Sequence, residues 1–223
     1  MNQDHLLQHP GLWRGGQMPP AADGLPTGYP ELDGLLPGGG WPVGALTEIL
    51  IPREGVGALG LVMPALARLS RDRRWLAWVA PPYIPYAPAL AAAGVDLSRI
   101  LLIHPRASGD GLWAVEQTLR SGTCGAVLAW PAAGDSRMLR RLQLAAEAGR
   151  TWGLLFRSER MADRPSPAAL RLQVTAERDG MTVRILKRRG GWAAGPVYLD
   201  ANHVVAQCES ALAAPGGLRP GRA

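Results

Sequence analysis

Four short, nearly continuous apolar runs constrain the fold of this chain more than any other feature. They span 75–79, 100–103, 126–130 and 152–156, and a further short strand candidate lies at 45–50. A strand that is apolar on both sides is typical of a parallel sheet whose two faces are covered by helices. We therefore predict a mostly parallel sheet in which these four runs are buried on both faces.

Two of the stretches between the runs carry helix start and stop signals. Asp110 can begin one helix, which Gly122 would end. Asp135 or Ser136 can cap a second helix, which would end near Gly149. The alternation of strands and helices predicts an α/β domain with a doubly wound sheet.

The last part of the chain changes to a period of two. Residues 170–176 and 181–185 alternate apolar and polar side chains, and Asp179-Gly180 lies between them. Alternation on both sides of an Asp-Gly pair is the strongest short-range signal for a hairpin. We predict a C-terminal antiparallel hairpin that closes one edge of the sheet.

Composition divides the chain into a core and two terminal segments. Residues 1–25 are rich in Gly, Pro and Gln, and we predict an extended N-terminal arm with one partner anchor at Trp13 and Arg14. Residues 26–200 form the predicted core domain, and 201–223 a partly flexible tail. The sequence contains no basic-then-apolar leader and no apolar run long enough to span a bilayer. We expect a cytoplasmic protein without a membrane partner.

Cationic residues are in excess, and nearly all of them are arginine. The formal net charge is +6, and all but one of the 24 Lys and Arg residues are Arg. Such a surface suits nucleic acid or an acidic protein as a partner, and the alternative is an ordinary solvated surface. The positions predicted to contact DNA or a partner protein are Arg137, Arg140, Arg141, Lys187, Arg188 and Arg189.

The segment 49–62 has the outline of a strand, a turn and a helix start, where a nucleotide-binding protein places its phosphate loop. A working loop needs G-x-x-x-x-G-K-[ST], because the lysine neutralises phosphate oxygens and the hydroxyl holds magnesium. The only lysine is Lys187, so no register of that motif fits. We predict a degenerate loop at Gly55, Gly57 and Ala58 and no cofactor. The backbone amides of the two glycines leave weak anion binding as the alternative.

Two further features bear on the chemistry and the local structure. Histidines are scattered, and Cys124 and Cys208 show neither metal-ligand spacing nor a disulfide framework, so we predict no metal site and no catalytic residue. Pro64 interrupts a segment that otherwise has helical spacing. Because proline removes a hydrogen bond inside a helix, we expect a kink or a delayed helix start there.

Several motifs, in their order along the chain, resemble the core of the RecA recombinase family. They lie at 25–28, 32–33, 38–44 and 94–97, and the hairpin with the segment 187–196 resembles the final strands of that core. The resemblance covers roughly residues 26–199. It implies a RecA-like core domain.

The catalytic positions of that family are replaced in this chain. Gly57 and Ala58 stand where the resemblance places the phosphate-binding lysine and the magnesium-binding hydroxyl. Pro82 stands at the catalytic glutamate, and Trp130 at the magnesium-coordinating aspartate. The resemblance therefore implies a RecA-like fold that is not an enzyme.

A narrower set of stretches is similar to the ImuA family, which is also called SulA-like. These stretches lie at 9–14, 35–42, 79–90, 112–117 and 127–130. The resemblance implies a non-catalytic accessory protein of SOS-induced mutagenic translesion DNA synthesis that acts through protein contacts. The implied partners are an ImuB-like homologue of the Y-family polymerases and an error-prone DnaE-type polymerase. Contacts with RecA, with DNA and with a second copy of the chain are further possibilities.

Two other functions are open on the sequence. One is a SulA-like inhibitor of cell division that binds FtsZ, and the other is a direct DNA-binding module, which rests on charge alone. SulA-type chains are shorter than this one. The Trp-Arg pair near the N-terminus and the basic end of the hairpin favour the translesion role.

Overall fold

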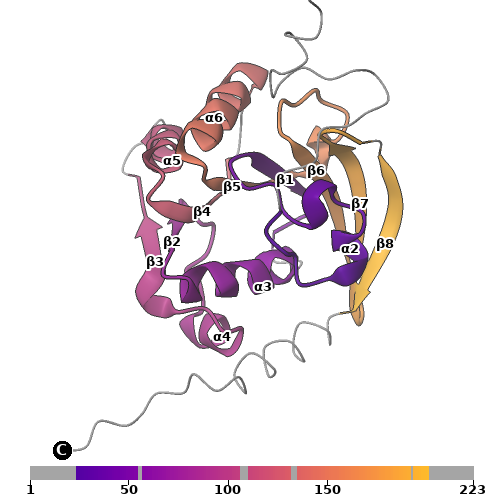
Figure 1. Cartoon of the computed structure of the whole chain (residues 1–223), viewed down its shortest axis with the longest axis horizontal. Coiled ribbons are helices and arrows are strands. Elements are labelled where there is room, and N and C mark those ends of the chain that lie inside the picture. Colours follow the sequence, from indigo (N-terminus) through magenta and orange to yellow (C-terminus); the bar gives the residue numbers. More distant parts are fainter. Residues whose placement is uncertain (1–23, 55–56, 106–109, 132–134, 192, 201–223) are drawn as a thin grey trace, which may run out of the picture.

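The computed structural model describes residues 24–54, 57–105, 110–131, 135–191 and 193–200. These residues form one eight-stranded sheet between two layers of helices (Figure 1). The strands are β1 (Leu46–Ile51), β2 (Trp75–Val79), β3 (Ile100–Ile103), β4 (Cys124–Ala129), β5 (Trp152–Ser158), β6 (Leu170–Glu177), β7 (Gly180–Arg188) and β8 (Ala194–Asp200). Their order across the sheet is β3-β2-β4-β5-β1-β6-β7-β8.

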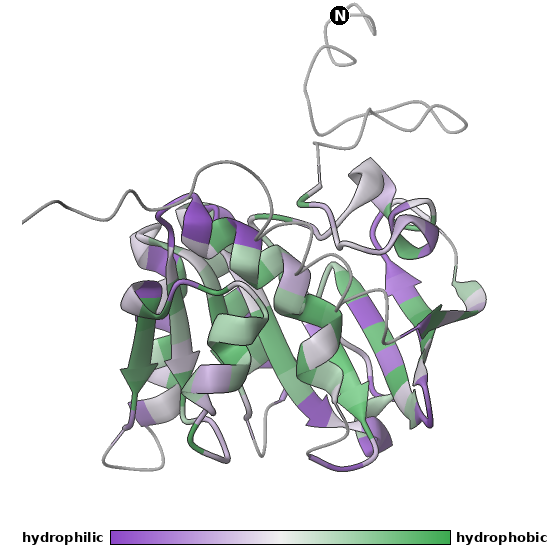
Figure 2. Ribbon diagram, turned by 90° about the horizontal axis from the view of Figure 1, so that it is seen from below, coloured by the Kyte–Doolittle hydropathy of each residue, from purple (hydrophilic) through white to green (hydrophobic). Residues whose placement is uncertain are grey.

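The sheet is parallel from β3 to β6, and β7 and β8 then add antiparallel strands. Every residue of β1 and β4 is buried, which is why these central strands are apolar along most of their length (Figure 2). The predicted α/β fold with a mostly parallel sheet is thus confirmed.

Helices cover both faces of the sheet (Figure 1). On one face α3 (Ala58–Arg71) and α4 (Ala87–Ala92) pack into the larger core, and on the other α5 (Asp110–Ser121) and α6 (Ser136–Gly149) pack into the smaller one. The remaining helical turns are α2 (Pro30–Asp33), η1 (Pro37–Gly39), η2 (Leu97–Arg99) and η3 (Glu159–Met161). None of the helices in the described ranges has the length and apolar character needed to cross a membrane.

The two ends of the chain fall largely outside the described residues. Of the predicted arm, only residues 24 and 25 are described, and the predicted tail at 201–223 is not. Leu25 is buried and forms an antiparallel bridge with Trp41, whose ring stacks on that of Trp152 at 5.2 Å between centroids. The packed core therefore already includes residue 25.

Two expectations about the sheet edges are wrong. The run 100–103 is not buried on both faces, because β3 is the edge strand: the side chains of Leu101 and Leu102 are 44% and 41% exposed. The predicted hairpin exists as β6 and β7, but it does not close the sheet, because β8 pairs with β7 and takes the edge. An apolar run indicates a strand, but it does not indicate whether that strand lies inside the sheet or at its edge.

Pro64 does not delay α3, which begins at Ala58 and continues to Arg71. A residue with an N–H at this position would donate to the carbonyl of Gly60, and proline cannot. The hydroxyl of Tyr29 instead donates to the Gly60 carbonyl at 3.3 Å. Tyr29 is 1% exposed, so a side chain distant in sequence satisfies the acceptor that Pro64 leaves without its usual donor.

A buried ion cluster joins the three strands at the middle of the sheet. The Glu48 carboxylate on β1 is fully buried and accepts from Arg157 on β5 at 2.5 Å and from Arg171 on β6 at 2.6 Å. Arg171 also donates to the main-chain carbonyls of Met161 and Ala162 at 2.7 and 3.1 Å. The cluster therefore fixes the connection between β5 and β6 as well as the strands themselves.

Replacing Glu48 with Gln should destabilise the protein strongly, because two buried guanidinium groups would lose their shared counter-charge. Breaking a buried pair in this way costs about 3–5 kcal/mol of unfolding free energy. Urea unfolding followed by circular dichroism measures the change. Glu116→Gln is the matched control: its partners Arg120 and Arg141 are more than half exposed, so the loss should be about 1 kcal/mol or less. Equal losses in the two variants would contradict this account.

The bond between Tyr29 and Gly60 should matter only while Pro64 is present. Tyr29→Phe should lower the unfolding free energy by about 1–3 kcal/mol, since it leaves a buried carbonyl without a donor. Pro64→Ala restores a backbone donor, so the same Tyr29→Phe change should cost clearly less in that background. A double-mutant cycle of unfolding free energies measures the coupling. A cycle with zero coupling would show that Tyr29 does not compensate for the proline.

Candidate protein-interaction site

A pocket lies where the carboxyl ends of four parallel strands meet the start of α3. Clefts at the carboxyl ends of the strands are the usual ligand sites of open α/β sheets. The pocket has a volume of about 230 Å³. Its walls are Ile51, Glu54, Gly57, Ala58, Leu59, Trp78, Pro81, Pro82, Tyr83, Ile84, Pro85, Tyr86, Trp130 and Phe156.

Three aromatic rings line the inner part of the pocket. Trp78 at the end of β2 and Phe156 on β5 are both buried, and Trp130, directly after β4, lies between them. The Trp130 ring stacks on Phe156 at 5.0 Å and 10°, and its centroid is 5.8 Å from that of Trp78. The buried indole N–H of Trp78 has no acceptor among the described residues. This end of the sheet is therefore an apolar, aromatic surface.

The outer rim of the pocket is a proline-rich segment that exposes three large side chains. Tyr83, Ile84 and Tyr86 are 68%, 85% and 71% exposed. Pro82 precedes them and Pro85 lies among them, and proline rings fix the backbone φ angle. Contiguous exposed apolar side chains on a soluble protein commonly mark an interaction site.

The positions that the sequence assigns to the degenerate phosphate loop lie at this pocket. Gly57 has a φ of 74° and precedes α3 without a side-chain cap, and the buried Ala58 begins the helix. Both line the pocket together with Pro82 and Trp130, whereas Gly55 lies outside the described residues. The pocket thus brings together four positions that the sequence comparison singled out separately.

The described residues of the pocket offer no positive side chain to a phosphate group. Glu54 is the one charged residue among these described walls, and it is exposed. Within the described ranges, no cluster of His, Cys, Asp and Glu could hold a metal ion either. The chemistry that the lining supports is apolar contact and ring stacking.

The basic run that ends β7 is occupied by contacts within the chain. Lys187 donates to the main-chain carbonyl of Ser166 at 2.6 Å, Arg188 donates to a carbonyl just before η1, and Arg189 pairs with Glu147 at 3.0 Å. Burial lowers the pKa of the Lys187 amine, and the charge of a neighbouring arginine lowers it further. These three side chains contribute to the packing of β7 against the segments beside it.

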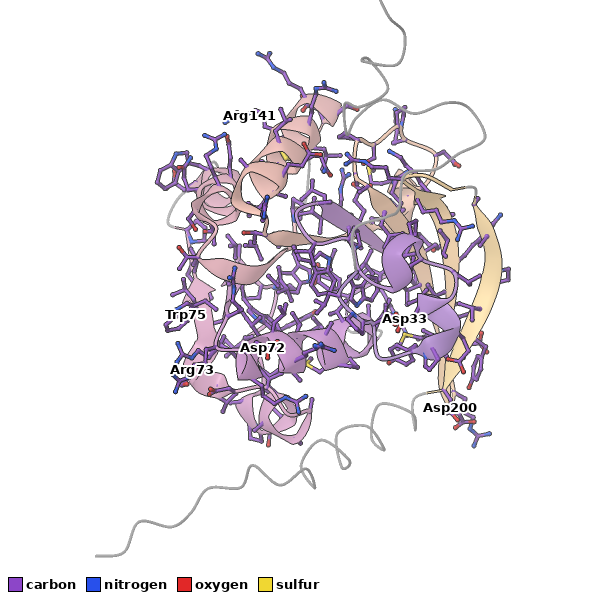
Figure 3. The ribbon with its side chains drawn as sticks, in the orientation of Figure 1. Asp33, Asp72, Arg73, Trp75, Arg141 and Asp200 are labelled. Carbon is purple, nitrogen blue, oxygen red and sulfur yellow. The ribbon has the colours of Figure 1, made fainter. Side chains whose placement is uncertain are left out.

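The arginines predicted on the second helix lie on α6, on the outer helix layer. Arg137 and Arg140 are exposed. Arg141, labelled in Figure 3, donates to the Glu116 carboxylate on α5. Arg137, Arg140 and Arg141 are thus all accessible, and Arg141 alone among these three forms an ion pair within the described part of the chain. The other predicted anchor, Trp13 and Arg14, lies outside the described residues.

Sequence reasoning did not single out the pocket or its rim as a site. The available signal was the run of prolines after the apolar run at 75–79, with two tyrosines and an isoleucine among them. That composition is unsuited to a core and indicates a fixed, exposed loop. The aromatic inner surface left no such signal, because its three rings come from separate strands.

Comparisons with known proteins place the chain among SulA-like proteins. The family profile described as "Cell division inhibitor SulA" matches residues 44–153. SulA of Edwardsiella piscicida is 36% identical over 104 residues, which are 45% of this chain and 61% of that protein. SulA of Pectobacterium atrosepticum is 30% identical over 121 residues, 54% of this chain and 72% of that protein.

Protein ImuA of Caulobacter vibrioides is 31% identical over 137 residues, 59% of this chain and 56% of that protein. Among solved structures, SulA from Pseudomonas aeruginosa has 30% identity and a TM-score of 0.43, and the match covers 50% of this chain and 97% of that one. The chain spans only about three fifths of the Edwardsiella relative. The match to most of the Pectobacterium protein nevertheless shows that this chain belongs to the SulA family.

Proposed function

We propose that this chain is a non-catalytic accessory protein of the bacterial SOS response that acts in mutagenic translesion DNA synthesis through protein contacts. Its proposed partners are an ImuB-like homologue of the Y-family polymerases and an error-prone DnaE-type polymerase. RecA, DNA and a second copy of the chain are further proposed contacts. The SulA family and the match to a protein named ImuA support a role in the response to DNA damage.

The aromatic pocket at the carboxyl ends of the strands is the observation that carries the non-catalytic part of the proposal. A phosphate-transferring site needs a cation, a metal-binding hydroxyl and a carboxylate at this place. The chain has Gly57, Ala58, Pro82 and Trp130 there instead, all around one pocket. Their convergence supports descent from a RecA-like core that has lost its nucleotide chemistry.

The last three strands favour the translesion role over the other functions. The 104 residues aligned with Edwardsiella SulA are 61% of that protein, whereas 137 aligned residues are only 56% of Caulobacter ImuA. The ImuA relative is therefore the longer of these two proteins. Beyond residue 153, where the SulA profile ends, the chain continues through β6, β7 and β8.

Inhibition of cell division through FtsZ is the second candidate. It is supported by the profile match to residues 44–153, which include β1 to β4 and nearly all of the pocket, and by the names of the SulA relatives. Both candidates are non-enzymatic and act through a protein surface. They differ in the partner.

Co-expression of the full chain with the ImuB-like protein from the same genome should give a complex that stays together on gel filtration. Overexpression of the chain alone should leave cell length unchanged, and the purified chain should not hydrolyse ATP. Filamentous cells that recover with an FtsZ variant, together with no ImuB-like complex, would establish the second candidate instead. ATP turnover above the blank would contradict both.

A further inference from the structure

We infer that the aromatic pocket and its proline-rich rim form a docking site for a segment of a partner protein that inserts one aromatic side chain next to a basic residue. The inference rests on the proposed function in one respect: it takes protein contact to be what this chain does. Beyond the proposed function, the inference names the surface of this chain that makes the contact and the kind of segment that binds there.

The size of the pocket sets the number of side chains that it can hold. Its volume is about 230 Å³. A dry apolar cavity of roughly 150 Å³ is large enough to bind benzene. The pocket therefore has room for one aromatic ring with its connecting carbon atoms, and not for two.

The lining favours an aromatic ring over an aliphatic chain. Trp130 stacks on Phe156 with centroids 5.0 Å apart, and the tilted ring of Trp78 lies 5.8 Å from that of Trp130. Such spacing is the one that aromatic pairs prefer, and a further ring can extend the series. Ile51 and Ala58 complete an apolar lining around it.

The negative charge of Glu54 in the pocket wall favours a basic residue beside the inserted ring. Among the described residues, Glu54 is the single charged side chain in the lining, and it is exposed, so it can contact a bound segment from the solvent side. A phosphorylated or acidic ligand would face this carboxylate without a compensating cation. A segment that carries Lys or Arg next to its aromatic residue would pair with it.

The rim indicates that the ligand is a polypeptide rather than a small molecule. Tyr83, Ile84 and Tyr86 extend the apolar surface well beyond the pocket itself, and all three are more than two thirds exposed. The prolines around them restrict the backbone before binding, so less conformational entropy is lost when a partner covers them. A central pocket that takes an aromatic anchor, surrounded by contacts that exclude water, is the usual anatomy of a protein interface.

The first test uses two short peptides and the full chain. N-acetyl-Trp-Arg-amide and N-acetyl-Trp-Glu-amide are titrated into ¹⁵N-labelled protein while the indole N–H resonances are followed. The Trp-Arg peptide should shift the resonances of Trp78 and Trp130 but not that of Trp113, and should bind about fivefold more tightly than Trp-Glu, as expected of a partly exposed ion pair. If the indole resonances of Trp78 and Trp130 do not shift at millimolar peptide concentrations, or if only that of Trp113 shifts, the inference is overturned.

Charge reversal provides a sharper test on exposed residues that leave the core unchanged. Glu54→Lys should invert the preference, so that the Trp-Glu peptide binds the more tightly. Asp72→Lys makes the same charge change just beyond the far end of α3 and should leave the preference as it was. Ile84→Asp should weaken both peptides by about tenfold. If Glu54→Lys and Asp72→Lys change the peptide preference to the same extent, Glu54 does not recognise the basic residue of the peptide.

The partner complex separates failure of the site from failure of the function. If the ImuB-like protein binds the wild-type chain and Ile84→Asp abolishes binding, both proposals stand. If it binds both forms equally, the translesion role stands and the docking site is wrong. If the peptides bind as expected but no ImuB-like complex forms, the site stands and the translesion role is wrong.

Discussion

The buried carboxylate of Glu48 is the interaction on which the arrangement of the sheet depends. β1 has β5 on one side and β6 on the other, and the two arginines that hold Glu48 come from those two strands. Removing three charges from water is costly, so the cluster is tolerated only because the carboxylate accepts from both guanidinium groups and Arg171 also reaches main-chain carbonyls. An apolar trio would hold the strands together, but it would not fix the segment at 159–162 in the same way.

That central arrangement has a consequence for the site. β1, β2, β4 and β5 are parallel, so their carboxyl ends lie at the same end of the sheet. Trp78, Trp130 and Phe156 come into contact there. This is the place where α/β proteins commonly bind nucleotides, and here it is the aromatic pocket. Aromatic rings line this place, and their chemistry favours ring contacts over the binding of a phosphate group.

The sequence predicted the elements well because their signals are local. The runs at 75–79 and 100–103 coincide with β2 and β3, and the alternation around Asp179-Gly180 gives β6 and β7. What it could not predict depends on residues far apart in the chain. Glu48 reads as an ordinary polar residue in a strand, since its partners are 109 and 123 positions away. The effect of Pro64 likewise depends on Tyr29, and the pocket on rings from three strands.

The edge of the sheet at β3 has a consequence for how the protein can associate with other chains. Natural edge strands are usually protected by charges, prolines or bulges, because an unpaired apolar edge recruits other strands. β3 reads Ile-Leu-Leu-Ile, without a charge or a proline, but it is only four residues long (Figure 2). Its short length limits the number of main-chain hydrogen bonds that a strand of another chain could form with this edge.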